Sequence, residues 1–239
     1  MQIVFLAIVF FIAGIVPELT GFGVATVSMS LLPFILPLEI VIPLVAIISV
    51  IAAGIVAFQT KSRHVLKHIA PLIAGSLTGV VVGMLFLNVI EINTLSIILG
   101  VFLVSYAFYG MFVREHFLPT GSKFGAIIGF FAGFFSSTFN IHGPLVGVYS
   151  SSDEKLSKVE LKDMIATYMF IAGIFTVSGH ALFGRVTMEV LGYLAVSLPF
   201  LVLGLVAGTK FFNKINAKFV KYGTYLFVFI AGVTLLFFK

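Results

Sequence analysis

The residues of this sequence that could do chemistry gather in two short segments inside apolar surroundings. The first reads VPELTGFGVA, residues 16–25, and the second reads FSSTFNIHGPL, residues 135–145. Each segment combines a proline, which removes a helix N–H donor, with glycine, which permits left-handed or extended backbone. We therefore expect each segment to end one helix and start another. The start of a helix presents unpaired N–H groups and the positive end of the helix dipole, which together can hold an anion.

We predict that a small anion binds at these two breaks. Two helix starts that meet from opposite sides of the membrane would form a cradle of backbone donors, to which hydroxyl and amide side chains add further donors. Bare backbone at this depth is tolerated only where it is buried in protein or lines a cavity. The residues assigned to the substrate are Thr20, Gly21, Phe22, Gly23, Ser137, Thr138, Asn140, His142 and Gly143.

The local sequence also predicts how the second helix of each break begins. Asn140 is interpreted as a residue of the N-cap region, and Pro144 suits the first turn of the helix that follows. In the first segment, Thr20 or Gly21 would cap a helix that starts near Gly23.

Three titratable side chains have more than one interpretation. Glu18 lies well inside an apolar stretch, so it either couples a proton or cation to transport or is a carboxylate bonded to backbone freed at the break or placed near the outer surface. His142 either contacts the anion or carries a proton, or it is a structural imidazole that holds the turn. His180, near the outer end of an apolar stretch, is interpreted as a surface or packing histidine.

The composition predicts an all-α integral membrane protein. Hydrophobic residues make up 60% of the chain and charged residues 10%, and several uncharged stretches reach the roughly 20 residues that cross the hydrocarbon. The absence of cysteine excludes disulfides and thiolate metal sites, and no metal, cofactor or catalytic set is expected. An intramembrane hydrolase built on Glu18 and His142 lacks the spacing of a nucleophile and its base. We expect no enzyme and no nucleic-acid partner.

The basic loops predict the orientation. Residues 59–68 and 210–221 carry Lys and Arg without any acid, so the positive-inside rule places both on the cytoplasmic side of the cell membrane. The chain between them must then cross an even number of times. Four clear spans already do so, which makes residues 124–152 a broken or re-entrant helical hairpin. The same reasoning makes residues 1–38 a second hairpin, entered from the other side.

The two halves of the chain match at a fixed offset of 119 residues. Ala13-Gly14 corresponds to Ala132-Gly133, and Ala53-Gly54-Ile55 to Ala172-Gly173-Ile174; Gly79 and Gly83 pair with Gly204 and Gly208 after a small insertion. Chance similarity in an apolar chain is the alternative. Inverted repeats with interrupted helices are typical of secondary transporters. The predicted repeats are residues 1–118, with hairpin 1–38 and spans near 40–60, 69–87 and 94–113, and residues 119–239, with hairpin 124–152 and spans near 164–184, 190–209 and 222–238.

The layout resembles the TauE/SafE family, the sulfite exporter or sulfonate-transporter group. The resemblance covers nearly the whole length and rests on two similar halves, each opened by a break: GIVPELTGFGVATVSMSLLPFILPLE and GFFAGFFSSTFNIHGPLVGVYSS. It implies transport of sulfite, sulfonates or related organic acids, often by a homodimer. The chain departs from the family's glycine-rich pattern at Val24, Ala25 and His142, which bears on the substrate rather than on the fold.

The sequence thus predicts a secondary transporter that works by alternating access at a midplane site between two broken hairpins. A passive anion channel is the alternative. The expected partners are a small anionic substrate, the lipid bilayer, a coupling proton or cation, and a second copy of the chain in a homodimer.

Overall fold

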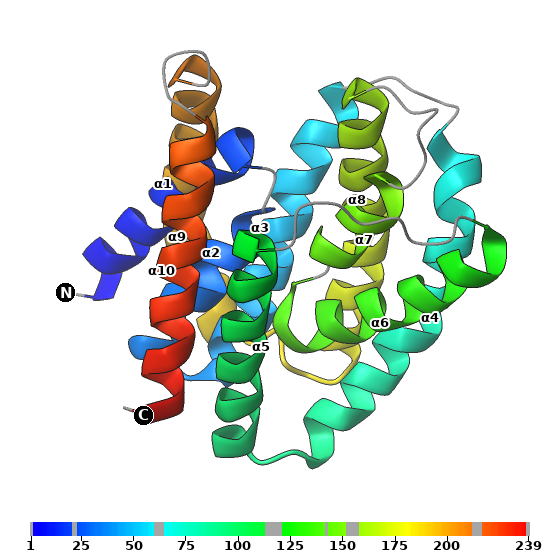
Figure 1. Ribbon diagram of the computed structural model, residues 1–239. Coiled ribbons are helices and arrows are strands. Elements are labelled where there is room, and N and C mark those ends of the chain that lie inside the picture. Colours follow the sequence, from blue (N-terminus) through cyan, green and yellow to red (C-terminus); the bar gives the residue numbers. More distant parts are fainter. Residues whose placement is uncertain are drawn as a thin grey trace. The chain divides into compact units, whose positions relative to one another are not determined.

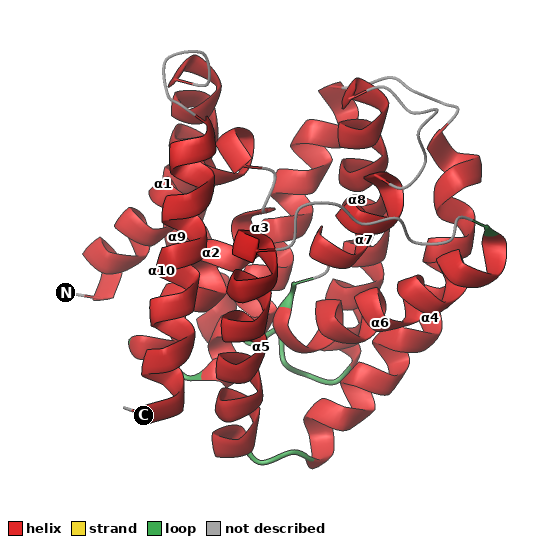
Figure 2. Cartoon of the chain, in the orientation of Figure 1, coloured by secondary structure: helices red, strands yellow, loops and turns green. Residues whose placement is uncertain are grey.

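The computed structural model describes residues 2–20, 23–59, 65–112, 121–141, 143–151, 158–211 and 217–237. All the regular structure in these ranges is helical, as Figure 2 shows, which confirms the all-α expectation. The elements are α1 (Gln2–Thr20), α2 (Gly23–Leu31), the 3₁₀ turn η1 (Leu32–Phe34), α3 (Leu38–Gln59), α4 (Val65–Val89), α5 (Ile92–Phe112), α6 (Ser122–Phe139), α7 (Gly143–Ser151), α8 (Lys158–Leu182), α9 (Met188–Phe211) and α10 (Ala217–Phe237).

Within the described residues, five helices are long and apolar enough to cross a membrane. Their apolar spans are Leu38–Phe58, Leu66–Val89, Ile92–Phe112, Asp163–Leu182 and Met188–Gly208. Large apolar side chains such as Val81 and Phe108 point outward from these helices, which is unfavourable in water and favourable against lipid. The protein is therefore a multi-pass membrane protein.

The chain forms two compact units. Unit 1 comprises Met1–Val45, Val89–Arg114 and Thr187–Lys239, and unit 2 comprises Ala46–Asn88 and Glu115–Val186. Each unit draws segments from both residues 1–118 and residues 119–239, and α3 passes from one unit to the other in mid-helix. Each unit is described by itself below.

In unit 1, helices that are far apart in the sequence lie side by side, as α1 and α9 do in Figure 1. A Cβ on Gly14 of α1 would collide with the backbone of α9 at Gly204, so the two helices approach at distances that only glycine allows. Helices α5 and α10 pack along each other in the same way, with Gly100 opposite Gly232. Such small-residue crossings let helices associate in lipid through close van der Waals contact.

Unit 2 repeats this device between α4 and α6. A Cβ on Gly75 or Gly79 of α4 would collide with carbonyl oxygens of α6, and a Cβ on Gly129 or Gly133 of α6 would collide with the backbone of α4. The crossing therefore brings main chain against main chain from both sides.

A second crossing in unit 2 joins α3 and α8 through glycine and a large side chain. Gly54 of α3 lies against the ring of Phe170 on α8, and Gly173 of α8 lies against Val50 on α3. Phe58 extends the contact, with its ring centroid 5.4 Å from that of Phe170. Beside this crossing lies a core of buried apolar side chains from α4, α6, α7 and α8: Ile69, Leu72, Ala132, Val146, Tyr149, Met164, Tyr168 and Ala172.

Gly79→Ala should destabilise the protein, because its new methyl group has no room beside the backbone of α6. We expect a loss of about 2 kcal/mol, seen as a lower thermal midpoint of the purified protein in detergent. Gly192→Ala is the matched control, since Gly192 lies within α9 with open space around its Cβ position. That variant should keep or slightly raise the midpoint, because alanine favours a helix more than glycine does. Equal midpoints for both variants would contradict the proposed close crossing.

Candidate functional site

The second predicted break is an interruption between α6 and α7 in unit 2. Helix α6 ends at Phe139, and Asn140 follows as its C-cap in the left-handed conformation, with φ 58° and ψ 16°. The Asn140 N–H donates to the carbonyl oxygens of Phe135 and Ser136, which satisfies the end of the helix. Helix α7 begins at Gly143, so Pro144 stands in its first turn as the sequence predicts.

The interpretation of Asn140 as an N-cap-region residue is wrong. An N-cap residue has extended backbone, whereas the positive φ of Asn140 ends α6 instead of starting α7. Asparagine is one of the few residues other than glycine that adopt this conformation readily, because its short polar side chain can bond locally. Residues 141 and 142 separate it from α7.

The hydroxyl groups predicted to bind the anion are engaged within the helix bundle. Ser137 Oγ and Thr138 Oγ1 donate to the carbonyl oxygen of Phe134 at 3.0 and 2.8 Å, and both side chains are fully buried. The neighbouring Ser136 hydroxyl lies 3.0 Å from that of Thr176 on α8. A hydroxyl has one proton to donate, so in this conformation Ser137 and Thr138 give theirs to the main chain and not to a ligand.

Ser137 owes its place to a glycine on the neighbouring helix. A Cβ on Gly83 of α4 would collide with Ser137 Oγ, so the hydroxyl occupies the space that this glycine leaves. The crossing of α4 and α6 thus extends to the break itself.

The first predicted break lies between α1 and α2 in unit 1. Helix α1 ends at Thr20, and α2 begins at Gly23, which has a φ of 75° that strongly favours glycine. The side chains of Glu18 and Thr20 lie outside the described residues, as do Gly21, Phe22 and His142. Gly143 is placed as the first residue of α7. The structure therefore describes Gly23, Ser137, Thr138, Asn140 and Gly143 among the assigned residues.

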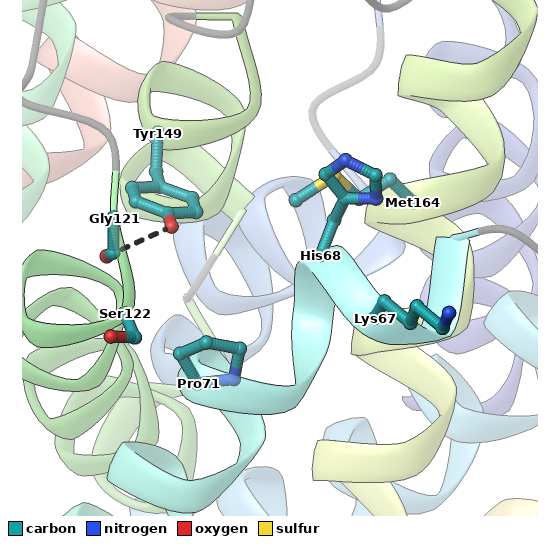
Figure 3. Close-up of a pocket in the computed structure, with 7 residues that line it drawn as sticks. All are labelled: Lys67, His68, Pro71, Gly121, Ser122, Tyr149 and Met164. Atoms are coloured by element: carbon teal, nitrogen blue, oxygen red, sulfur yellow. Dashed lines mark hydrogen bonds between the residues drawn. The ribbon is translucent and has the colours of Figure 1, made fainter.

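Unit 2 also contains a pocket that the sequence gives no signal for. Its volume is about 260 Å³, and Figure 3 shows its lining residues, which are Lys67, His68, Pro71, Gly121, Ser122, Tyr149 and Met164. The Tyr149 hydroxyl donates to the carbonyl oxygen of Gly121 at 3.3 Å across one wall. Along α4, about 24 Å of helix separates Lys67 from Gly83 beside the break, so the α4 wall of the pocket lies far from the break along that helix. Its lining comes from four separate segments of the chain.

The structure contradicts one of the two interpretations of His180, as a surface or a packing histidine, and agrees with the other. Its side chain is fully buried in the last turn of α8, so a surface position is wrong and a place in the packed interior is correct. The signal in the sequence is a spacing: Tyr168, Thr176 and His180 are eight and four residues apart, which puts polar groups on one face of an apolar helix. All three are buried.

Asn140→Gly should retain the thermal midpoint, because glycine adopts the left-handed conformation without strain. Asn140→Val should lower the free energy of unfolding by about 1–2 kcal/mol, because a β-branched residue is strained there. Thermal unfolding of the two purified variants beside the unsubstituted protein measures both effects. If glycine destabilised as much as valine, the side-chain amide and not the backbone conformation would hold the break.

Comparison with protein-family models matches residues 6–235 to the family described as Sulfite exporter TauE/SafE. The match spans nearly the whole chain and confirms the resemblance seen in the two breaks. No curated protein and no solved structure matches the chain. The family consists of membrane transporters, which agrees with the multi-pass helical fold and with the expectation that the chain is not an enzyme. The chain therefore belongs to the TauE/SafE sulfite exporter family.

Proposed function

We propose that the protein is a secondary transporter of a small anion, most simply sulfite, an organosulfonate or a related organic acid. The anion binds at the helix breaks, residues 20–23 and 137–143, and alternating access exposes it to each side of the cell membrane in turn. Loops 59–68 and 210–221 lie on the cytoplasmic side, and the working form is a homodimer. A passive anion channel gains no support from the family match.

The observation that carries this proposal is the pair of short helices that start at the breaks. Helices α2 and α7 are each nine residues long and start at Gly23 and Gly143, about half the chain apart. The first N–H groups of a helix have no partner within it, so each start offers donors together with the positive end of the dipole. In α7 the donors of the first turn come from Gly143, Leu145 and Val146, because Pro144 has no N–H.

The engaged hydroxyls support a site made mainly of backbone. Since Ser137 and Thr138 donate to Phe134, an anion at the second break relies on main-chain N–H groups. Main-chain donors recognise a compact oxyanion by charge and size, which suits sulfite and the head of a sulfonate equally.

The helix crossings support an inverted repeat. By the sequence offset, α1 corresponds to α6 and α9 to α4. Gly14 of α1 contacts α9, and Gly133 of α6 contacts α4, so in each case the helix before a break packs on a span from the other half of the sequence. Gly54 and Gly173, also 119 residues apart, lie on opposite sides of one α3–α8 crossing. Such reciprocal contacts are expected from two related halves that interlock.

Counterflow tests the transport mode. Purified protein in liposomes loaded with unlabelled sulfite should take up labelled sulfite, with a rate that saturates and falls when a sulfonate competes. A carrier exchanges its substrate in this way, whereas a channel carries current without exchange. Sulfite-dependent current in planar bilayers without any counterflow would reject the carrier.

Gly23→Asn tests the site itself. Asparagine tolerates the positive φ of this position, but its side chain would obstruct the start of α2, so we expect sulfite affinity to fall at least about tenfold. Gly184→Asn is the control, since Gly184 also has a positive φ, of 69°, and its Cβ position has open space. Binding is read from the shift in thermal midpoint with sulfite concentration, which also shows that each variant is folded. Unchanged affinity in Gly23→Asn would remove the first break from the site.

A further inference from the structure

A row of side chains at steps of four residues winds along α8 through unit 2. It consists of Met164, Tyr168, Ala172, Thr176 and His180, three of which are polar, and each of these side chains is at most 2% exposed. Asp163, also 2% exposed, stands at the same end as Met164. From Asp163 to His180 the helix rises about 25 Å, close to the thickness of the hydrocarbon. The row therefore reaches from one end of the apolar span to the other.

The two ends of the row are ionisable side chains without hydrogen-bond partners. Both carboxylate oxygens of Asp163 and both ring nitrogens of His180 are buried and unpartnered within the part of the chain that the structure describes. Leaving such a group buried and unpaired destabilises the folded protein, most strongly if the group is charged. Burying an ionisable group at this depth in a membrane is energetically unfavourable, and such groups commonly serve in proton relays.

Hydroxyl pairs occupy the middle of the row. The Tyr168 hydroxyl lies 2.5 Å from Ser76 Oγ, and Ser76 itself donates to carbonyl oxygens of Leu72 and Gly129. Either hydroxyl of this pair can be the donor. One turn before His180, Thr176 pairs with Ser136 of α6, in the last turn before the break at Asn140. The row thus meets the helix that carries the second break.

We propose that this row of α8 is the proton-coupling element of the transporter, with His180 and Asp163 as the groups that take up and release the coupled proton. The proposal rests on the proposed function and names its coupling ion.

The pocket of Figure 3 lies beside the Asp163 end of the row, because Met164 is among its lining residues. The pocket extends from exposed Lys67, His68 and Ser122 to buried Met164, the direct neighbour of Asp163 in the chain. Among the described side chains, the titratable groups near this end include Lys67 and His68 from α4, Lys123 from α6, Tyr149 from α7 and Glu160 from α8. This pocket is the proposed route between Asp163 and the surface.

At the other end, the chain folds back over His180. Gly184 has a φ of 69°, the Arg185 N–H donates to the carbonyl oxygen of His180 at 2.9 Å, and the Gly184 N–H donates to that of Ala181 at 3.0 Å. This pattern is a Schellman motif, in which the residues in the positions of His180 and Arg185 usually make an apolar contact. Here both side chains are cationic or can become so.

The groups that face His180 limit how it holds a proton. Arg185 follows His180 in the Schellman motif, and the Arg185 guanidinium donates to the side-chain oxygen of Asn88 at the end of α4. The other neighbours described here, Met84 of α4 beside Gly179 and Ser136 of α6 bonded to Thr176, carry no charge. An anion bound near Arg185 and His180 would balance the positive charge that the coupled proton brings.

At each end of the row, the proton that is taken up is also released. Neutral His180 takes one proton from water on its bare nitrogen as an imidazolium and returns one proton to water when it becomes neutral again. The Asp163 carboxylate binds one proton as a carboxylic acid and releases it to water in the pocket. Ala172 has no polar group, so the row is interrupted midway in this conformation. A coupled carrier needs such a gap, because a continuous row would discharge the gradient without moving substrate.

The test separates exchange of substrate from its proton-driven accumulation. Full-length protein in liposomes is assayed for sulfite counterflow at equal pH and for sulfite accumulation under a pH difference of about one unit, with protein-free liposomes subtracted. One proton per anion supports up to about tenfold accumulation under that gradient. His180→Gln and Asp163→Asn should each retain counterflow and lose accumulation, and the dependence of accumulation on pH should flatten.

Two further variants serve as a control and as a second, independent test. Glu189→Gln removes an exposed acid at the start of α9 and should accumulate sulfite like the unsubstituted protein. Thr176→Val keeps both ionisable ends and should reduce accumulation at least twofold, so it tests the row even if one end variant fails to fold, as judged by its thermal midpoint. Accumulation that survives in folded His180→Gln and Thr176→Val overturns the proposal, as does an unsubstituted protein that exchanges sulfite but ignores the gradient. Absence of counterflow in the unsubstituted protein would reject the proposed function instead, and the coupling role with it.

Discussion

Every main-chain N–H and C=O in the hydrocarbon must find a partner within the protein, since the bilayer offers none. That constraint explains the helical fold, and it makes each interruption of a helix expensive, at several kcal/mol for every group left bare. At the end of α6 the cost is met locally: Asn140 turns left-handed and returns its N–H to Phe135 and Ser136. The hydroxyls of Ser137 and Thr138 fold back onto Phe134 in the same turn. A break satisfied in this way leaves its unpaired donors on the far side, at the start of α7, where a ligand can use them.

The same constraint requires that a break be packed in protein and not exposed to lipid. Glycines on α4 and α6 meet this need, because main chain against main chain is the closest approach two helices can make. Gly83 completes the arrangement by leaving room for Ser137. The glycine spacing noticed in the sequence is therefore part of the site's construction, although none of these glycines contacts the proposed anion.

Local chemistry made the helices and their interruptions predictable. Long uncharged stretches indicate spans, and the helix starts at Gly23 and Gly143 follow from proline and glycine in otherwise apolar sequence. The sequence does not show which of several possible hydrogen-bond partners each polar group takes. Asn140 suits an N-cap and a left-handed C-cap equally well, and the hydrogen bonds of α6 decide between them. The Ser137 hydroxyl looked available to a ligand because its acceptor, Phe134, is the backbone of its own helix. His180 looked peripheral because the Schellman turn that buries it depends on Gly184, in the loop beyond the span.

The two helix crossings of unit 2 differ in the substitutions that they can accept. Where α4 meets α6, Gly75, Gly79, Gly129 and Gly133 face backbone, which no substitution can make smaller, so a larger residue there has no compensating change on the other helix. Where α3 meets α8, Gly54 and Gly173 face the side chains of Phe170 and Val50, which can shrink. Substitutions at the second crossing can therefore be accepted in pairs, and these positions should covary among relatives while the glycines of the first stay invariant. The contacts that hold α6, the helix before the second break, therefore cannot change in sequence. The contacts between α3 and α8 can change in sequence when the transported substrate changes.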